Sequence, residues 1–335
     1  MYECILSIII PVYNGQKSIK KCLNSILKQD DINMEIILVD DGSTDNTAKM
    51  IKENYSNSKI KYFYKKNEGV SRARNYGIKQ STGMFIMFVD VDDELYGKSL
   101  NNIINFMQKN TDIDCIMGSY YSFRGKKIIK KQLFDFNIMS KYDFFSDIEN
   151  NLSVIVTPWS KVYRTNIILD NNIIFDADLT IGEDTLFNIN YFLCCRKICT
   201  IDDVVYRYNV GGVASSRTYH ENINEMYYKT YVAYKKLNLK SDFLFDLGLE
   251  LMFASIDHYS FNCKRKVAIK KIEDTLRIFN EIVINNKFVE KLSYEEVKNI
   301  KNQNINKFYD LFIKKNKFKY IKRKIANCIR NIIQI

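Results

Sequence analysis

Histidine is scarce in this 335-residue chain, which contains only His220 and His258. A zinc or iron site with several histidine ligands is therefore nearly excluded, and a Ser–His–Asp triad has little to build on. If the protein is an enzyme, its acid–base chemistry has to rest on carboxylates. The eight cysteines form no Cys-x-x-Cys pair, and the chain starts without a secretory signal pattern. These two absences predict a cytosolic protein with free thiols.

Long hydrophobic runs and glycine-rich phosphate loops are also missing. No apolar run approaches the roughly 18 residues that a membrane-spanning helix needs, so any membrane contact is expected to be peripheral. The turn at 11–18 lacks Gly-x-Gly-x-x-Gly, and no Gly-Lys-Ser/Thr occurs anywhere. A Rossmann dehydrogenase and a P-loop enzyme are both disfavoured for that reason.

Apolar residues make up 46% of the chain, which is enough for a large folded core. In the first hundred residues their pattern alternates between buried strands and amphipathic helices. Strands are predicted at 5–10, 35–39, 59–65 and 84–89, and helices at about 19–27, 43–51 and 70–80. This alternation predicts an α/β fold with a mostly parallel sheet flanked by helices. After about residue 219 only helical patterns remain, which predicts an α/β domain at 1–218 and a helical C-terminal region at 219–335.

Polar segments follow each of the four predicted strands, at 11–14, 40–43, 67–69 and 90–93. Open α/β sheets bind ligands at the carboxyl ends of their strands, so we expect one site to collect all four segments. Asn, Asp and Gly also form ordinary turns, but four such segments together favour a site. The Asp90-Val91-Asp92 sequence suits Mg²⁺ or Mn²⁺, with diphosphate oxygens completing the coordination.

Five ordered segments of this chain resemble the family 2 inverting glycosyltransferases, over about the first 215 residues. They lie at 7–14, 37–45, 67–75, 88–93 and 182–187. The resemblance implies a GT-A fold, a Rossmann-like sheet flanked by helices, and a nucleotide-sugar donor that is most often UDP-linked. It also implies transfer of the sugar to an acceptor hydroxyl with inversion of configuration.

The resemblance implies a nucleotide site at the first three strand ends. Pro11 and Tyr13 would line the uracil, and Asp41 would accept a hydrogen bond from it. Asn67 and Arg74 would border the nucleotide and its diphosphate. For Arg74 the alternative is a place on a solvated helix face.

The carboxylates of the reaction are assigned by the same resemblance. Asp90 would hold the ribose, and Asp92 would coordinate the Mn²⁺ or Mg²⁺ cofactor. Asp184 would be the general base, and Glu183 would position the acceptor or the base. The alternative for Glu183 and Asp184 is that acidic residues simply favour the first turn of a helix.

Two regions leave their interpretation open. Trp159, the only tryptophan, would either be an exposed indole that stacks on the acceptor sugar or a hydrophobic anchor. Further on, Asn209 stands where the family commonly has arginine, and no histidine aligns nearby. Either other residues supply those diphosphate contacts or this part of the site differs. The candidates are Arg207, Ser215, Ser216, Arg217 and His220.

The chain carries a formal net charge of +11, and most of it lies at the C-terminal end. Residues 301–335 hold ten Lys and Arg but only one acid, Asp310. An apolar stripe at 318–332 predicts a basic amphipathic helix that binds an anionic membrane surface, and the alternative is a helix that packs on the protein.

Together these features predict a metal-dependent inverting glycosyltransferase, peripheral at the inner face of the cell membrane, with a glycan or lipid-linked acceptor used in cell-surface glycan synthesis. A metal-dependent nucleotidyltransferase is one alternative. A non-catalytic basic binder of nucleic acid or anionic surfaces is another, although nucleic acid binding would not explain carboxylates at the strand ends.

Overall fold

The computed structural model describes residues 3–29, 32–55, 58–147, 154–211, 220–237, 239–285 and 292–315. The chain divides into two compact units, Met1–Ser215 and Ser216–Ile335. The boundary predicted at residue 218 and the basic helix predicted at 318–332 both lie outside the described residues.

The first unit is built on a sheet whose strand order is β3-β2-β1-β4-β9-β6-β10-β5, with β7 paired to β6 and β8 to β10. The strands are β1 (Cys4–Val12), β2 (Met34–Asp40), β3 (Ile60–Tyr64), β4 (Gly83–Phe88), β5 (Glu94–Leu95), β6 (Ile113–Arg124), β7 (Lys127–Gln132), β8 (Asn137–Ser140), β9 (Lys161–Arg164) and β10 (Lys197–Asn209). Strands β1 to β4 pair in parallel, and so do β6 and β10. Because β9 is antiparallel to both β4 and β6, the carboxyl ends of β1 to β4, β6 and β10 share one edge of the sheet. The predicted α/β fold with a mostly parallel sheet is confirmed.

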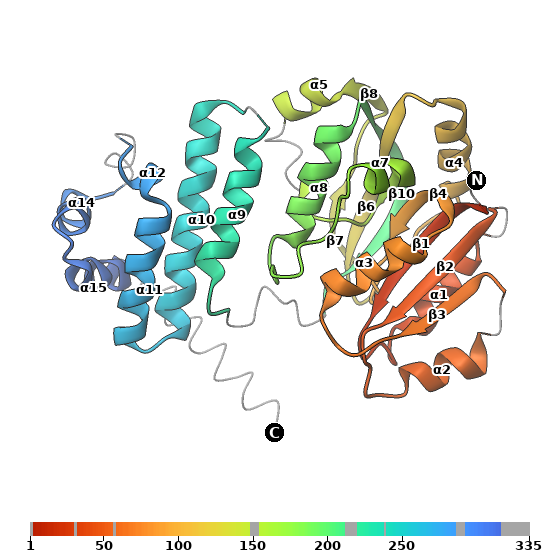
Figure 1. Cartoon of the computed structure of the whole chain (residues 1–335), viewed down its shortest axis with the longest axis horizontal. Helices are drawn as coiled ribbons and strands as arrows, with labels where there is room; N and C mark the ends of the chain where they lie inside the picture. The colour runs from red at the N-terminus through yellow and green to blue at the C-terminus, as the bar shows by residue number, and fades with distance from the viewer. Residues whose placement is uncertain are drawn as a thin grey trace. The chain divides into compact units, whose positions relative to one another are not determined.

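Helices cover both faces of this sheet (Figure 1). Leu6, Ile8 and Ile10 of β1 share a core with the buried side chains of α1 (Ile19–Leu27), α2 (Thr47–Asn54) and α4 (Leu100–Lys109). The intervening Ile9 faces α3 (Val70–Gln80), where a Cβ on Gly77 would overlap the Ile9 Cγ2 atom. The α1 side and the α3 side are therefore opposite faces of the sheet, as the alternation of strand side chains requires.

Helix α8 (Glu183–Cys194) lies on the same face as α3. Phe187 of α8 contacts Phe88 of β4, with ring centroids 5.6 Å apart, and stacks on Phe175 at 4.0 Å. Phe88 alternates with Phe85 and Met87, which belong to the core on the α1 face. The start of α8 is thereby placed near the carboxyl edge of the sheet.

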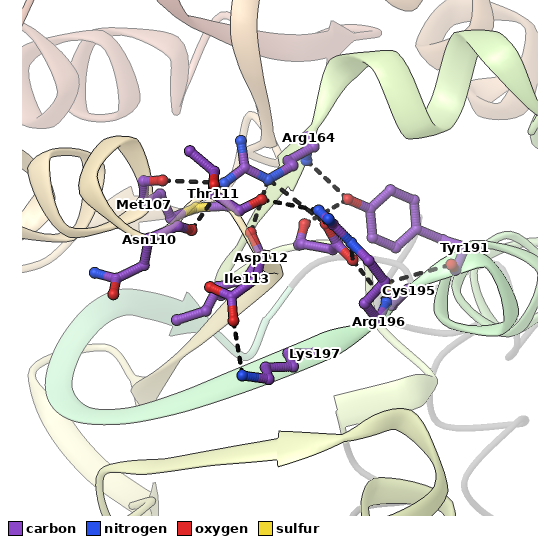
Figure 2. A network of polar contacts seen from close by, with 11 residues as sticks. Met107, Asn110, Thr111, Asp112, Ile113, Arg164, Tyr191, Cys195, Arg196 and Lys197 are labelled. Atoms are coloured by element: carbon purple, nitrogen blue, oxygen red, sulfur yellow. Dashed lines mark hydrogen bonds and ion pairs between the residues drawn. The ribbon is translucent and has the colours of Figure 1, made fainter.

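A polar network fastens the other end of α8 to the start of β6 (Figure 2). The Tyr191 hydroxyl of α8 donates to the Asp114 carbonyl at 2.6 Å. The Asp114 carboxylate accepts from the backbone and the guanidinium of Arg196, at 2.6 and 2.7 Å. Arg164, the last residue of β9, donates to the carbonyls of Met107 and Ile113. Buried polar groups satisfied in this way fix the direction of α8.

The second unit is helical, as predicted. Its described helices are α9 (Ile223–Lys235), α10 (Ser241–Asn262), α11 (Arg265–Ile278), α12 (Asn280–Val283), α14 (Tyr294–Lys301) and α15 (Ile305–Lys315). Their core includes the fully buried Met252, Ile256, Ile272 and Phe308. Across the part of the chain that the structure describes, no helix is both long enough and apolar enough to cross a membrane.

Candidate active site

The acidic pair predicted as base and positioning residue opens helix α8. Gly182 precedes it with φ +86°, a left-handed conformation that glycine adopts without strain, and the helix begins at Glu183. The side chains of Glu183 and Asp184 are 10% and 22% exposed. Both carboxylates approach the guanidinium of Arg74 in α3, so more than the helix dipole holds them there.

Arg74 joins two carboxylates with different predicted roles, Asp184 as the general base and Asp90 as the residue that holds the donor ribose. Its Nη1 atom donates to Asp184 Oδ1 at 2.7 Å, and its Nη2 atom donates to Asp90 Oδ1 at 2.9 Å. Glu183 lies farther away, with Oε1 at 3.9 Å from Nη1. The side chain of Arg74 is only 4% exposed, and its guanidinium lies 5.1 Å from the Phe175 ring centroid. The alternative of a solvated helix face is wrong for Arg74.

In this cluster, burial and the neighbouring charges shift the pKa of each group in opposite directions. Burial raises the pKa of Asp184 to about 7, even though the Arg74 charge works to lower it. Burial also raises the pKa of Glu183, again against Arg74. Burial alone would lower the pKa of Arg74, but Asp184, Asp90 and Glu183 outweigh it, and the net direction is upward. A pKa raised in this way suits the general-base role predicted for Asp184, and that role stays a prediction.

The three aspartates after β4 have different environments. Asp93 is buried and accepts from the Tyr206 hydroxyl at 2.9 Å and from the Asn209 backbone at 2.7 Å. Burial, with the Asp90 charge, raises the pKa of Asp93 to about 8. Asp92 is exposed, and among the described residues its carboxylate accepts no hydrogen bond.

Asp92 is therefore the carboxylate of this segment that remains available to a cation. The described residues contain no cluster of three or more His, Cys, Asp or Glu suited to hold a metal. Mg²⁺ commonly binds through one or two carboxylates together with substrate phosphates. The donor set at Asp92 fits such an ion, and the assignment of Mn²⁺ or Mg²⁺ to Asp92 stays a prediction.

Hydrogen bonds bring the loops after β1 and β2 together. Asn14, with φ +52°, accepts on its Oδ1 atom from the backbone of Thr44 at 2.8 Å and of Asp45 at 3.3 Å. In return, the Asn14 backbone donates to Ser43 Oγ at 2.9 Å. Tyr13 next to it is 51% exposed and Pro11 is buried at the end of β1, so their contact with a uracil stays a prediction.

Asp41 fastens the loop after β3 to the end of β2. It accepts from the backbones of Glu68 at 3.0 Å and Gly69 at 2.7 Å, and from Lys65 Nζ at 2.6 Å. The exposed Asn67 lies in the same loop. No pattern in the sequence pointed to Lys65, because the partner of a lysine depends on tertiary packing. The predicted hydrogen bond from Asp41 to a base stays a prediction.

The structure corrects the exposed-indole interpretation of Trp159. Its side chain is 6% exposed and stacks on Tyr206 and Tyr208, with ring centroids at 4.7 and 5.2 Å. Tyr120 meets it edge-on at 4.7 Å. Three aromatic residues from neighbouring strands thus enclose the indole, a packing that the sequence did not reveal. Trp159 is a hydrophobic anchor, the second of the two alternatives.

A buried lysine two residues further along the chain holds the backbone beside Trp159. The Nζ atom of Lys161 donates to the Thr157 carbonyl at 2.6 Å and to the Trp159 carbonyl at 3.3 Å. Burial lowers the pKa of Lys161 to about 7. Asn188 of α8 donates to the same Thr157 carbonyl at 2.7 Å, so this turn is tied to the helix that carries Asp184.

Part of the first unit is similar to a family of known proteins. Residues 7–170 match the family model described as "Glycosyl transferase family 2". The glycosyltransferase EpsJ of Bacillus subtilis (strain 168) is 30% identical over 210 residues, which cover 61% of this chain and 60% of EpsJ. The poly(ribitol-phosphate) beta-N-acetylglucosaminyltransferase TarS of Staphylococcus aureus (strain MW2) is 30% identical over 209 residues, covering 60% of this chain and 35% of TarS.

The fold is also that of a solved structure, S. aureus TarS 1–349 in complex with UDP-GlcNAc. The TM-score is 0.70 at 22% identity, and the match covers 91% of this chain and 89% of that one. This likeness confirms the GT-A fold. The chain spans only about a third to three-fifths of the length of the curated relatives that it matches.

Proposed function

Residues 7–170 make the first unit of this chain a member of glycosyl transferase family 2, and from this membership we propose that the protein transfers a sugar from a UDP-sugar to an acceptor hydroxyl with inversion. The observation that carries the proposal is the Arg74 bridge between Asp184 and Asp90. It sets a carboxylate with a near-neutral pKa beside the strand end where the family binds its donor.

In the proposed reaction the acceptor oxygen bonds to the anomeric carbon as the bond from that carbon to the diphosphate oxygen breaks. The acceptor proton passes to the Asp184 carboxylate, and the nucleoside diphosphate leaves with the bonding electron pair. A single displacement of this kind inverts the configuration at the anomeric carbon. Arg74 keeps Asp184 oriented and partly offsets the effect of burial on its pKa.

The strand-end loops support a nucleotide-sugar donor. Hydrogen bonds to Asn14 and Asp41 hold the loops after β1, β2 and β3 together at the carboxyl edge of the sheet. Tyr13 and Asn67 are exposed there. A Mg²⁺ or Mn²⁺ ion at Asp92 would supply Lewis-acid stabilisation of the diphosphate. Because a TarS structure holds UDP-GlcNAc, UDP-GlcNAc is the first donor to test.

The test measures UDP release from UDP-GlcNAc and other UDP-sugars with Mn²⁺, Mg²⁺ or a chelator. Asp184→Asn should lower turnover by about a thousandfold or more while UDP-GlcNAc still binds. The matched control is Asp203→Asn, an exposed aspartate in β10, which should stay within twofold of the wild type. Pyrophosphate release from a nucleoside triphosphate would favour the nucleotidyltransferase alternative. Absence of turnover and binding with every nucleotide sugar would overturn the proposal.

For the acceptor, we propose a glycan or lipid-linked glycan precursor at the inner membrane face. The support is the charge of residues 301–335, with ten Lys and Arg against one acid. Deletion of residues 317–335 should release the protein from vesicles containing anionic phospholipid while activity on a water-soluble acceptor persists. Equal vesicle binding by the full and shortened chains would contradict the membrane role.

A further inference from the structure

A cavity of about 680 Å³ opens beside Asp92 in the first unit. Its walls come from the start of α1, the turn between β6 and β7, and the end of β10. The residues that line it with charged groups are Lys17, Lys21, Asp92, Glu94, Lys126 and Arg207. Because β6 and β10 run parallel to β4, the cavity lies at the edge of the sheet where the four polar segments also lie.

One of the four cations already has its partners. Arg207 pairs with Glu94 at 3.2 Å, donates to the Gly125 carbonyl at 3.0 Å and covers the Phe123 ring at 3.9 Å. Lys17, Lys21 and Lys126 have no carboxylate partner among the described residues. With the carboxylate of Asp92 counted, the charged side chains that line the cavity sum to +2, a condition that favours an anionic ligand.

Of the two cations that the family resemblance implies at the diphosphate, one is already paired and the other is absent from this sequence. Arg74 is buried and holds Asp90 and Asp184 with its two terminal nitrogens. Asn209, which occupies the common place of an arginine, donates its side-chain amide to the Asp92 carbonyl at 2.8 Å. The charge that a departing diphosphate requires has to come from elsewhere in the site.

The lysines and the base lie on opposite faces of the sheet. Lys17 and Lys21 belong to the start of α1, whereas Asp184 is held between α8 and α3. Asp90 and Asp92 follow β4 at the edge between these faces. A displacement with inversion needs the base and the leaving group on opposite sides of the anomeric carbon, and this arrangement provides both sides.

We propose that Lys17, Lys21 and Lys126 bind the diphosphate of the nucleotide donor and stabilise it as it leaves. The inference rests on the proposed function and adds to it the residues that neutralise the leaving group. Together with the cation expected at Asp92, these lysines take the place of the arginine that is absent at position 209.

The test compares ligands that share a base but differ in phosphate. Calorimetry measures the affinities of UDP and uridine for the full chain carrying Lys17→Gln, Lys21→Gln, Lys126→Gln or all three substitutions. We expect each single variant to lose about three- to tenfold in UDP affinity and the triple variant on the order of a hundredfold. Uridine affinity should not change. Lys20→Gln, on the same helix but outside the cavity, is the matched control and should bind UDP as the wild type does.

Other outcomes overturn the inference. Equal losses for UDP and uridine would indicate damage to the fold, and unchanged UDP affinity would mean that the lysines are only solvated. A higher acceptor KM with unchanged UDP affinity would assign the cavity to a phosphate of the acceptor. A wild type that binds neither UDP nor UDP-GlcNAc would overturn the proposed function as well, so the two failures are distinguishable.

Discussion

The two sides of the sheet edge differ in whether their charged side chains are paired. On the α3 and α8 side, Arg74 is buried against the carboxylates of Asp90, Glu183 and Asp184. On the α1 side, Lys17, Lys21 and Lys126 have no ion-pair partner in the described part of the chain, and neither has the exposed Asp92 at the edge. A buried charge destabilises the fold unless it is paired, whereas an exposed charge is solvated by water and stays available to a ligand.

On the first side the charges are paired when the protein folds. On the second side they are paired only when a substrate or a cation binds. The paired side should respond to substitution in both stability and activity. The unpaired side should respond in activity and ligand binding alone. Each prediction below tests one side of that contrast.

The largest effect is expected for Arg74→Met. Loss of the guanidinium leaves three carboxylates close together and uncompensated, so the free energy of unfolding should fall by about 3–5 kcal/mol, with turnover lost. Trp159, the only tryptophan, is buried in the first unit, and its fluorescence during urea unfolding reports on that unit.

Two companion variants sharpen the Arg74 experiment. Arg74→Lys keeps the charge but cannot bridge Asp90 and Asp184 with two nitrogens, so it should recover only part of the stability. Arg74→Met combined with Asp184→Asn should be more stable than Arg74→Met alone, because one uncompensated charge is removed. Additive losses in the double variant would mean that the two residues are not coupled.

A smaller effect, confined to activity, is expected for Asp92→Asn. Turnover should fall by about a hundredfold or more, since a carboxamide binds Mg²⁺ or Mn²⁺ poorly. The unfolding free energy should stay within about 0.5 kcal/mol of the wild type, because the side chain is exposed. Excess Mn²⁺ should restore part of the turnover. A stability loss as large as that of Arg74→Met would remove the contrast between the two sides.

Much of the fold could be predicted from local sequence patterns. Strand β1 is a run of apolar residues that ends at Val12, before the polar Asn14, and the 3.6-residue pattern of α3 ends near Gly83. These signals depend on near neighbours, so the parallel pairing of β1 to β4, although not their order in the sheet, could be predicted from them. The later strands β5 to β10 were not predicted, because their pairing joins segments far apart in the chain.

The site was predictable where a residue's role depends on its place at a strand end or a helix start. Asp90 and Asp184 are of this kind. The Arg74 bridge joins positions 110 and 16 residues away from it, and no periodic pattern encodes such a contact. For Trp159, burial was decided by Tyr206 and Tyr208 on another strand, which the sequence did not place opposite it.

The pH dependence of turnover gives a further, moderate effect on the paired side. Asp184 acts as a base only when deprotonated, and its pKa is raised to about 7. We expect kcat/KM to be level above that pH and to fall about tenfold per pH unit below it. Arg74→Lys should move the midpoint upward, because the guanidinium opposes the effect of burial. A profile that stays level down to pH 5 would exclude Asp184 as a base with a raised pKa.

The smallest effect is expected for Trp159→Phe, and it tests whether the enclosed indole takes any part in acceptor binding. Phenylalanine keeps an aromatic ring against Tyr206 and Tyr208 but leaves some of the space empty, so the first unit should lose about 1–2 kcal/mol of stability. Hydrogen exchange of the β10 amides measures this loss without the tryptophan signal. The acceptor KM should stay within twofold, because an indole with 6% exposure has little surface to offer a sugar. A tenfold rise in acceptor KM with unchanged exchange rates would restore the stacking role and would place an acceptor contact within the aromatic core.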